Sequence, residues 1–452
     1  MSKVFFEMKN IVTLILAVLP LVCCTDKKEA LVIEPNIVLI MADDLGYGDL
    51  SSYGNTAIHT PNIDFLAAEG VKFTDYHSNG SVCSPTRAAL MTGKYQQRTG
   101  VAGVVTAKSH RHVGLSLKEI TIADELKKYG YNCGIYGKWH LGYSNEFNPI
   151  HQGFDAYTGF VSGNVDFHAH IDQEGYLDWW KGTSIANEEG YTTDLITDYS
   201  VKYIQEQNPK KTHKPFFLYV PHEAPHSPYQ RRMDKVLREV GKAGTIQVQK
   251  DSIPSIYKEM IEVMDEGVGK IIEALKETGQ YENTLIIFLS DNGANHNGDN
   301  GVLRGFKGGA YEGGSRVPGI MTYPNKIKKG IVNEQTILSM DMLPTILDFV
   351  GQKPSAEVDG ISIRKSLVQA IDLPKRDVFY AYKNKSFIRS GKWKMLRIEK
   401  EDSTHFELFD MLVDLSEQID VGPEHPILID SLKEKLEHWE KEVWDGVAPV
   451  SN

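Results

Sequence analysis

Short apolar runs alternate with helical segments along the chain from residue 36 onward. Four of these runs predict core strands, at residues 37–41, 132–136, 216–220 and 284–289, and polar, ionisable residues follow each of them at once. Alternation of buried strands with helices is typical of an α/β fold with a mostly parallel sheet. Ligands of open α/β sheets bind at the carboxyl ends of the strands. We therefore expect the residues that follow the four runs to meet at one site.

Helix signals lie between the predicted strands. Thr60-Pro61 is typical of a helix start and Gly70 of a helix end. Thr121 and Gly130 mark the limits of a second helix in the same way. These helices complete the strand and helix alternation that the α/β prediction requires.

The last part of the chain has a different pattern. A helix predicted over residues 341–350 and a loop over 351–360 precede four short strands, placed around residues 378–382, 387–388, 392–397 and 407–410. A final amphipathic helix is predicted near residues 429–443. Consecutive strands followed by a helix are typical of a small α+β unit. We expect a main domain over residues 36–365 and a C-terminal subdomain, an antiparallel sheet plus a helix, over residues 366–452.

The N-terminus has the pattern of an export signal. Lys3 and Lys9 precede an apolar run over residues 11–22, which is short for a membrane span and suits a secretory signal. The run ends at Cys23-Cys24 before a charged stretch, and this resembles a bacterial lipoprotein signal. We expect residues 1–24 to be a lipoprotein signal peptide, with lipidation at Cys24 and a location in the periplasm or at the cell surface of a Gram-negative bacterium. An ordinary signal peptide that carries two cysteines is the alternative.

Composition narrows the class of partner. The chain has 452 residues, of which 41% are hydrophobic and 24% charged, as in an ordinary globular protein. Its net charge of −11 disfavours a nucleic-acid partner, because binding phosphates requires a positive field. The four cysteines, at positions 23, 24, 83 and 133, exclude a disulfide scaffold. We expect an exported protein without a nucleic-acid partner, with any membrane contact limited to the lipid anchor.

Carboxylates follow two of the predicted strands. Asp43-Asp44 comes after the first strand and Asp291-Asn292 after the fourth. Adjacent carboxylates repel each other unless a positive charge lies between them. Oxygen donors without nitrogen or sulfur suit calcium or magnesium better than zinc. We therefore predict a hard-cation site there, although Asp and Asn at strand ends also cap turns.

The segment around Cys83 predicts a helix start. Ser84 is a suitable N-cap, Pro85 fits the first helical position and Gly93 can end the helix. We expect Cys83 just before this helix, where backbone N–H groups attract anions, and Arg87 can turn back toward it. The residues alone leave a structural thiol and a nucleophile equally open.

A resemblance to a known family decides between these readings. The stretch CSPTRAALMTGK at residues 83–94 resembles the modification motif of type I sulfatases, in which the cysteine is oxidised to formylglycine. Five further blocks match the family in the same order along the chain. One precedes the cysteine motif, at residues 36–48 (NIVLIMADDLGYG), and four follow it, at residues 137–142 (GKWHLG), 215–228 (PFFLYVPHEAPHSP), 289–293 (LSDNG) and 304–318 (RGFKGGAYEGGSRVP). The implied fold is alkaline-phosphatase-like: a large mixed sheet sandwiched by helices, with a small C-terminal sheet domain. The similarity favours the arylsulfatase and N-acetylgalactosamine-6-sulfatase-like branch.

The resemblance also implies roles for individual residues. One Ca²⁺ would be bound by the strand-end oxygens and by position 83, that is by Asp43, Asp44, Asp291, Asn292 and the 3-oxoalanine (formylglycine) derived from Cys83. Six residues would form the catalytic set: Cys83, Arg87, Lys138, His140, His226 and Lys307. Without the resemblance, Lys138 and Lys307 would be expected as solvated residues in turns. A formylglycine-generating maturation enzyme would be a necessary partner.

The substrate is predicted less directly. Residues 154–181 are rich in aromatic residues and histidines, which suit sugar rings and their hydroxyls, although a hydrophobic cover over the sheet is an alternative. His168 and His170 in this stretch, and His222, are our candidates for substrate binding. We expect a sulfated carbohydrate from a glycosaminoglycan or an algal polysaccharide. The competing functions are a phosphomonoesterase or phosphodiesterase of the same superfamily, and a lipoprotein that binds sulfated glycans without turnover.

Overall fold

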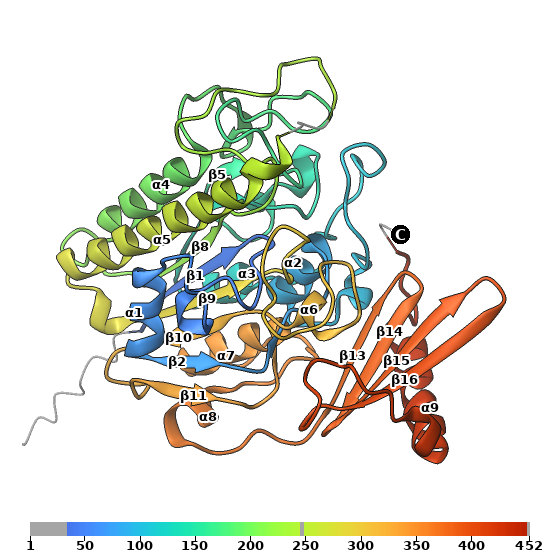
Figure 1. Cartoon of the computed structure of the whole chain (residues 1–452). Coiled ribbons are helices and arrows are strands. Elements are labelled where there is room, and N and C mark those ends of the chain that lie inside the picture. The colour runs from blue at the N-terminus through green and yellow to red at the C-terminus, as the bar shows by residue number, and fades with distance from the viewer. Residues whose placement is uncertain (1–33, 245–247, 450–452) are drawn as a thin grey trace, which may run out of the picture. The chain divides into compact units, whose positions relative to one another are not determined.

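A ten-stranded mixed sheet forms the centre of the fold (Figure 1). Its strand order in this computed structural model is β11-β2-β10-β9-β1-β8-β4-β5-β6-β7. The structure describes residues 34–244 and 248–449, so the predicted signal peptide over residues 1–24 and its Cys24 lie outside the described residues.

The four predicted core strands lie side by side in this sheet. They are β1 (Asn36–Ala42), β4 (Asn132–Lys138), β8 (Phe216–Pro221) and β9 (Thr284–Ser290). All three contacts in the series β9-β1-β8-β4 are parallel. The carboxyl ends of these strands therefore lie at one edge of the sheet. This confirms the prediction that the residues following the four strands in sequence meet at one place.

Shorter strands extend the sheet on both sides and make it mixed. They are β2 (Val71–Phe73), β5 (Ala156–Phe160), β6 (Trp180–Lys181), β7 (Ser184–Ile185), β10 (Gly319–Thr322) and β11 (Ile331–Asn333). β10 runs antiparallel to β9 and β2, while β5 runs parallel to β4. A separate parallel pair joins β3 (Tyr76–His77) to β12 (Ile337–Leu338).

Helices cover both faces of the sheet, as predicted. Alternate residues of β1 point to opposite faces, so Leu39 joins one buried cluster and Val38 the other. On the Leu39 side lie α2 (Cys83–Thr92), α3 (Ile122–Lys127), α7 (Met342–Phe349) and α8 (Arg364–Gln369). On the Val38 side lie α1 (Pro61–Glu69), α4 (Thr192–Glu206) and α5 (Ile253–Glu277). The predicted α/β sandwich is confirmed.

The helix starts marked by Thr60-Pro61 and Thr121 are correct, whereas α3 ends at Lys127, before the predicted limit at Gly130. Thr121 forms the expected capping box at the start of α3. The helix that carries the cysteine, however, begins at Cys83 itself, with Val82 in the N-cap position, so the predictions that Ser84 caps it and that Cys83 precedes it are wrong. The reason is tertiary: the Ser84 hydroxyl accepts a hydrogen bond from the backbone N–H of Val105 at 3.1 Å.

The C-terminal part is the predicted antiparallel sheet with a helix. β13 (Asp377–Tyr382), β14 (Lys385–Ser390), β15 (Trp393–Lys400) and β16 (Ser403–Asp410) pair in sequence order, and α9 (Pro426–Val443) follows. Their hydrophobic cluster also contains Ala89 from α2 and Ala310 from the loop before α6 (Glu312–Ser315). The residues from Glu34 onward form one compact unit, so a separate domain over residues 366–452 stays a prediction.

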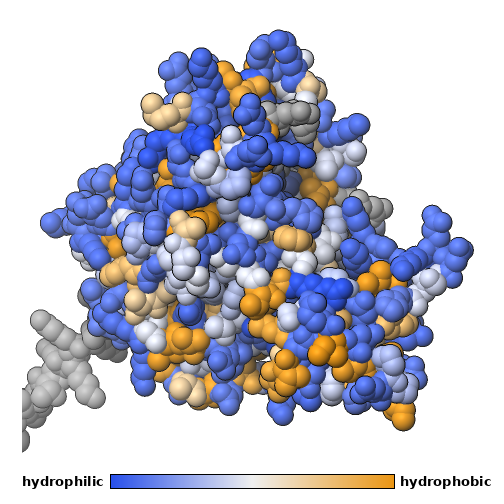
Figure 2. Space-filling model, in the orientation of Figure 1, coloured by the Kyte–Doolittle hydropathy of each residue, from blue (hydrophilic) through white to orange (hydrophobic). Residues whose placement is uncertain are grey.

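The face shown in Figure 2 is largely hydrophilic, with hydrophobic residues in small groups. Figure 2 keeps the orientation of Figure 1, so this face can be compared with the labelled elements. Among the described residues, none of the helices combines the length and the apolar character that crossing a membrane requires.

A buried lysine joins the C-terminal sheet to the main sheet's loops. Lys394 on β15 lies 2.8 Å from Glu312 on α6 and 2.8 Å from Glu417, and all three side chains have no exposed surface. Charges inside a protein are stable only when they are paired, because burial removes their hydration. The Lys394 ammonium group therefore balances much of the negative charge of both glutamates.

Removal of this ammonium group should destabilise the whole chain. We expect Lys394→Met to lower the free energy of unfolding by about 3–5 kcal/mol, because buried Glu417 loses its ammonium partner and Glu312 is left with Arg316. The matched control is Lys392→Met, since the Lys392 side chain is 43% exposed and its ion pair with Asp410 lies at the surface. Urea unfolding of both variants tests this, and equal losses would show that Lys394 is not a critical contact.

Candidate active site

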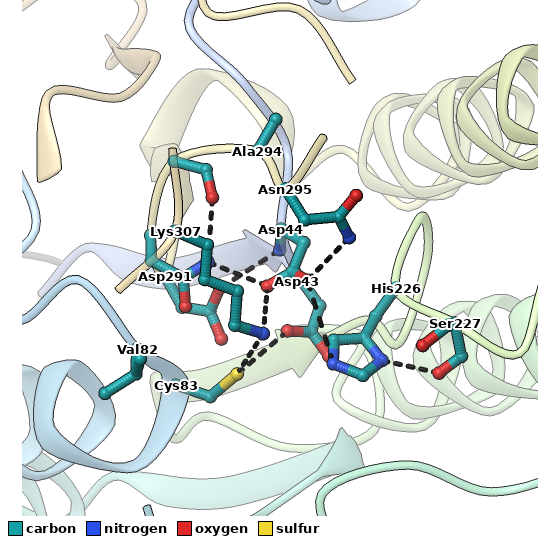
Figure 3. Close-up of polar contacts among 12 residues, drawn as sticks. Asp43, Asp44, Val82, Cys83, His226, Ser227, Asp291, Ala294, Asn295 and Lys307 are labelled. Atoms are coloured by element: carbon teal, nitrogen blue, oxygen red, sulfur yellow. Dashed lines mark hydrogen bonds and ion pairs between the residues drawn. The ribbon is translucent and has the colours of Figure 1, made fainter. Parts of the chain in front are cut away.

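The polar residues behind the core strands meet at the carboxyl edge of the sheet (Figure 3). Asp43 and Asp44 follow β1, and Asp291 follows β9, as the strand bounds place them. Asp44 has a φ of 64°, a left-handed conformation that is uncommon outside glycine and is often found at functional sites. The backbone N–H of Asp44 donates to Asp291 Oδ1 at 3.2 Å, which joins the two strand ends.

Each of the three buried carboxylates has a basic partner from a different element. Lys138 Nζ at the end of β4 lies 2.5 Å from Asp43 Oδ2. Arg87 on α2 donates twice to Asp291 Oδ2, at 3.1 Å and 2.8 Å. Lys307 Nζ lies 2.6 Å from Asp44 Oδ1. The site therefore brings three buried carboxylates together with three basic groups.

These contacts separate the pKa values of the carboxylates. Burial and the charge of Asp291 raise the pKa of Asp43 to about 7. Burial also opposes ionisation of Asp44, but Lys307 and His226 outweigh it and hold the Asp44 pKa below its usual range. For Asp291, Arg87 and Lys138 outweigh burial and lower the pKa. The charge of Asp43 is thus the least compensated of the three.

An unpaired buried oxygen marks a place for a cation. Asn292 Oδ1 is buried and has no hydrogen-bond partner among the described residues. Asp43, Asp44, Cys83 and His226 each offer an atom within 4.8 Å of the others, a spacing that could hold a metal ion. Carboxylate and amide oxygens suit a hard divalent cation. The residues present therefore fit such an ion, and His226 joins this geometric group although the sequence assigned it only to catalysis.

Cys83 is the first residue of α2 and lies between these charges. Its Sγ lies 3.4 Å from Asp43 Oδ1 and 3.3 Å from Lys307 Nζ. Burial, together with Asp291 and Asp43, raises the pKa of the thiol well above its usual range. A thiol is a nucleophile only as thiolate. Cys83 in its unmodified form is therefore a poor nucleophile, despite its place at a helix start.

Lys138 and Cys83 both contact Asp43, and His140 lines the same cavity as Cys83. Arg87 Nη1 donates to the Lys138 carbonyl at 3.0 Å and so fixes the end of β4. His140, with a φ of 59°, donates from Nε2 to the Val105 carbonyl at 2.9 Å. Its Nδ1 is buried without a partner among the described residues. The ring thus offers one free acceptor to the site.

The two histidines after β8 differ in position. His226 lines the cavity beside Cys83, its Nε2 lies 3.7 Å from Asp44 Oδ2, and its Nδ1 bonds the Ser227 carbonyl. Burial, Lys307 and Lys138 lower the pKa of His226 to about 3. His222 is fully buried, and burial lowers its pKa to about 4. Within the described part of the chain, neither of its ring nitrogens has a hydrogen-bond partner. His226 is thus the one of the pair that substrate can reach.

His168 and His170, the other proposed substrate contacts, lie elsewhere. His168 Nε2 bonds the Arg231 carbonyl at 3.0 Å. His170 is fully buried and stacks on Trp179, with ring centroids 4.5 Å apart. Neither lines the cavity beside Cys83. Their positions do not support substrate contact and agree with the alternative, a hydrophobic cover.

A cavity of about 390 Å³ opens beside Cys83, His140, His226 and Lys307. The rest of its lining comes from residues 104–109, 162–164 and 172–174 together with Tyr143. Residues 162–164 and 172–174 belong to the stretch 154–181 that the sequence analysis marked for substrate, whereas residues 104–109 and Tyr143 were missed. Because β5 runs parallel to β4, the residues that follow it reach the same edge of the sheet. Gly163 lies there against His140, and a Cβ on it would come within 2.9 Å of His140 Nε2.

Asn164 in this lining has a fixed orientation. Its Oδ1 accepts a hydrogen bond from Arg238 Nη2 at 2.6 Å. A guanidinium group can only donate, so the amide oxygen must face Arg238 and the amide nitrogen must face away from it. Asn164 therefore presents N–H donors on its other side, and it is one of the residues that line the cavity.

A second acidic cluster proves to be an ion-pair network. Asp75, His77 and Glu312 also lie close enough together to hold a metal. However, Arg316 contacts both carboxylates at 3.1 Å, and further basic groups contribute from the C-terminal sheet. The basic partners are Arg316, Arg389 and Lys394. This cluster is already neutralised without an ion.

Comparisons with known proteins agree with this geometry. Residues 35–352 match the family model "Sulfatase", and residues 306–442 match "N-sulphoglucosamine sulphohydrolase, C-terminal". N-acetylgalactosamine-6-sulfatase of Mus musculus is 33% identical over 375 residues, which cover 76% of this chain and 68% of that protein. Arylsulfatase A of Homo sapiens is 33% identical over 401 residues, covering 80% and 74%.

A solved structure supports the same relationship. The crystal structure of Ps i-CgsB is similar with a TM-score of 0.81 and 30% identity, and the alignment covers 92% of this chain and 94% of that chain. The alignment therefore extends over both the main sheet and the C-terminal part of this chain. The chain therefore belongs to the sulfatase family, has the alkaline-phosphatase-like fold and is a sulfuric ester hydrolase.

Proposed function

We propose that this sulfatase removes O-sulfate groups from a glycosaminoglycan or algal polysaccharide saccharide, through a formylglycine formed from Cys83 and beside a bound calcium ion. The observation that carries this proposal is the environment of Cys83. Its thiol lies between Asp43 and Lys307 at the cavity, yet burial and two carboxylates keep it protonated. A position so central and so unsuited to thiolate chemistry favours conversion of the side chain.

The proposed conversion explains the need for this residue type. A formylglycine hydrate carries two hydroxyls on one carbon, so that one can attack sulfur while the other can later expel sulfate. His140 offers an unpaired Nδ1 acceptor for a hydroxyl at position 83. Lys307 Nζ, at 3.3 Å from the sulfur of Cys83, can donate to an oxygen there. Activity would then depend on a maturation enzyme in the host.

Calcium is proposed from the donor set. Asp43, Asp44, Asp291 and Asn292 would hold it, together with position 83, and the unpaired Asn292 oxygen supports this. A bound divalent cation would neutralise the negative charge that grows on the nonbridging oxygens of the ester. Burial and the charge of Asp291 raise the pKa of Asp43 to about 7 in the free site, and a nearby cation would favour its ionised form.

The three basic residues have different access to substrate. Arg87 and Lys138 are buried and engaged with Asp291 and Asp43. The Lys307 side chain is 20% exposed and lines the cavity. We therefore assign direct contact with the sulfate group to Lys307, while Arg87 and Lys138 orient the groups around position 83. Preorganised positive charge of this kind stabilises the charge that develops during sulfur–oxygen cleavage.

His226 is assigned to the leaving group. Since the Ser227 carbonyl can only accept, the ring proton sits on Nδ1 and Nε2 is the free nitrogen beside the cavity. The lowered pKa keeps the ring neutral in the free site. A bound anion opposes this effect, because negative charge nearby favours the imidazolium. The ring can then take a proton and deliver it from Nε2 to the departing oxygen.

A saccharide substrate is supported by the polar lining of the cavity. Ser162, Asn164, Asp172 and Glu174 line it with side chains that can form hydrogen bonds. Ps i-CgsB, the relative described above, has been solved in complex with k-i-k-neocarrahexaose, and the mouse relative is named for a sulfated amino sugar. These features favour a sugar sulfate over a simple aryl sulfate.

We also propose export and a lipid anchor at Cys24, with location in the periplasm or at the cell surface of a Gram-negative bacterium. The support is the sequence of residues 1–24: two lysines, an apolar run and a cysteine pair. Radiolabelled palmitate incorporated by the wild type and lost in Cys24→Ala would test the anchor.

The function itself is tested by release of sulfate. Wild type should release sulfate from 4-nitrophenyl sulfate and from members of a panel of defined sulfated saccharides, and should leave 4-nitrophenyl phosphate largely intact. The mass of the tryptic peptide that contains Cys83 should be that of formylglycine. Cys83→Ser should lose sustained turnover, because a sulfated serine has no second hydroxyl to expel sulfate. Wild-type rates in this variant would refute the mechanism, and preference for the phosphate ester would favour the alternative phosphoesterase.

Removal of the metal should both inactivate and destabilise the enzyme. Chelation should abolish turnover, and calcium should restore it and raise the thermal unfolding midpoint, because it separates carboxylates that repel one another. Asp44→Asn should remove this rise in midpoint. Asp49→Asn is the control, since Asp49 is buried nearby but hydrogen-bonded to Gly46 and Tyr257. Full turnover by metal-stripped protein would contradict the assignment.

His226 should matter most for poor leaving groups. We expect His226→Ala to reduce kcat/KM on a sugar sulfate by about 10²–10⁴-fold, and to affect 4-nitrophenyl sulfate far less, because its phenolate leaves without a proton. His222→Ala, the matched control, should show no such dependence on the leaving group. Equal losses on both esters would reduce His226 to a sulfate-binding residue, and a leaving-group effect at His222 would show that the roles are exchanged.

A further inference from the structure

The C-terminal sheet reaches the active site through one tyrosine. Tyr380 on β13 is 1% exposed, and its hydroxyl makes two hydrogen bonds to the main part of the chain. One joins it to Ser81 Oγ, and the other goes to the carbonyl of Gly309 at 3.3 Å. Ser81 lies just before Cys83, and Gly309 lies just after Lys307. A single side chain thus contacts both segments that carry the proposed chemistry.

The two segments also contact each other. The backbone N–H of Gly308 donates to the Ser81 carbonyl at 2.8 Å, while Lys307 Nζ reaches Cys83 Sγ at 3.3 Å. Tyr380, Ser81 and the chain at 308–309 therefore form a closed ring of contacts. Within such a ring, a shift of one segment changes the distance from the lysine ammonium group to position 83.

The hydroxyl of Tyr380 is well suited to this linkage. The Gly309 carbonyl can only accept, so Tyr380 must donate to it and must accept from the Ser81 hydroxyl. The ring itself is held by Phe387 on β14, with centroids 4.9 Å apart and planes 10° apart. A phenylalanine could fill the same space but would leave both partners without the tyrosine hydroxyl.

The loop that carries Lys307 has further anchors in the C-terminal part. Arg304 Nη1 donates to the Glu417 carbonyl at 2.6 Å, and the backbone N–H of Glu312 donates to Glu417 Oε2 at 2.7 Å. These bonds fix the two ends of the loop. Tyr380 contacts the loop between these two ends, at Gly309, which is two residues from Lys307.

We propose that Tyr380 is a positioning residue of the sulfatase site, which holds the Lys307 loop against the Cys83 segment. It sets the distance between the Lys307 ammonium group and the side chain at position 83. The C-terminal sheet, which carries Tyr380, therefore helps to position the catalytic groups. This inference rests on the function proposed above for Cys83 and Lys307.

The first test compares two tyrosines of the same strand. Tyr380→Phe should lower kcat/KM on 4-nitrophenyl sulfate by about 10- to 100-fold, because a small misplacement of a catalytic group costs this much. Tyr382→Phe is the matched control, since Tyr382 is half-buried and makes no hydrogen bond through its hydroxyl to the Cys83 segment or the Lys307 loop. Rates are divided by the fraction of protein with formylglycine, measured by mass spectrometry, so that altered maturation is not counted as altered catalysis.

Ser81→Ala should reproduce part of the loss, and the double variant should be no slower than Tyr380→Phe alone, because both changes break the same link. Hydrogen exchange should become faster at residues 304–312 in Tyr380→Phe and stay unchanged in β14 to β16. Wild type without sulfatase activity would refute the proposed function instead. Active wild type with equal rates for the two tyrosine variants, additive losses with Ser81→Ala, or faster exchange throughout the C-terminal sheet would overturn this inference.

Discussion

Three buried carboxylates at one edge of the sheet are the constraint on which the rest of the structure depends. Asp43, Asp44 and Asp291 follow two adjacent parallel strands and have almost no exposed surface. Each must be neutralised inside the protein, because burial removes its hydration. The basic partners come from separate elements: Lys138 from β4, Arg87 from α2 and Lys307 from the loop before α6. The site can therefore exist only when the sheet, a helix and this loop are all in place.

The same constraint decides what position 83 can do. A cysteine at a helix start beside two basic groups would ordinarily be activated as a thiolate. Here burial and the carboxylates act in the opposite direction and raise the thiol pKa. The surroundings that disfavour a thiolate also provide donors and acceptors for neutral hydroxyls, in Lys307 and in the unpaired nitrogen of His140. The electrostatics thus fit a converted side chain better than the genetically encoded one.

The C-terminal sheet supports the site from outside the main sheet. Its buried Lys394 compensates Glu312 at one end of the Lys307 loop, and Tyr380 contacts the loop next to Lys307. Lys307 lines the cavity, and its loop is contacted at Gly309 and Glu312 by side chains more than seventy residues further along the chain. The hydrophobic cluster that contains residues of α2 and of β13–β16 also packs the C-terminal sheet against the helix that carries Cys83.

Sequence alone determined the local features of this protein. The apolar runs predict β1, β4, β8 and β9, because strands buried on both faces need continuous apolar residues. The motif around Cys83 identified the family, and parallel strand ends predicted that Asp43 and Asp291 would meet. The start of α3 was predicted correctly because its capping group, Thr121, is local.

Tertiary structure decided the rest. Ser84 does not cap α2 because Val105, distant in sequence, uses its hydroxyl. His168 and His170 lie away from the cavity, while Asn164 lines it in an orientation fixed by Arg238. The pKa of Cys83 and the link through Tyr380 likewise depend on groups from separate parts of the chain. Burial, pKa and hydrogen-bond orientation depend on which distant side chains share one low-dielectric volume, and a linear pattern of residues does not contain that information.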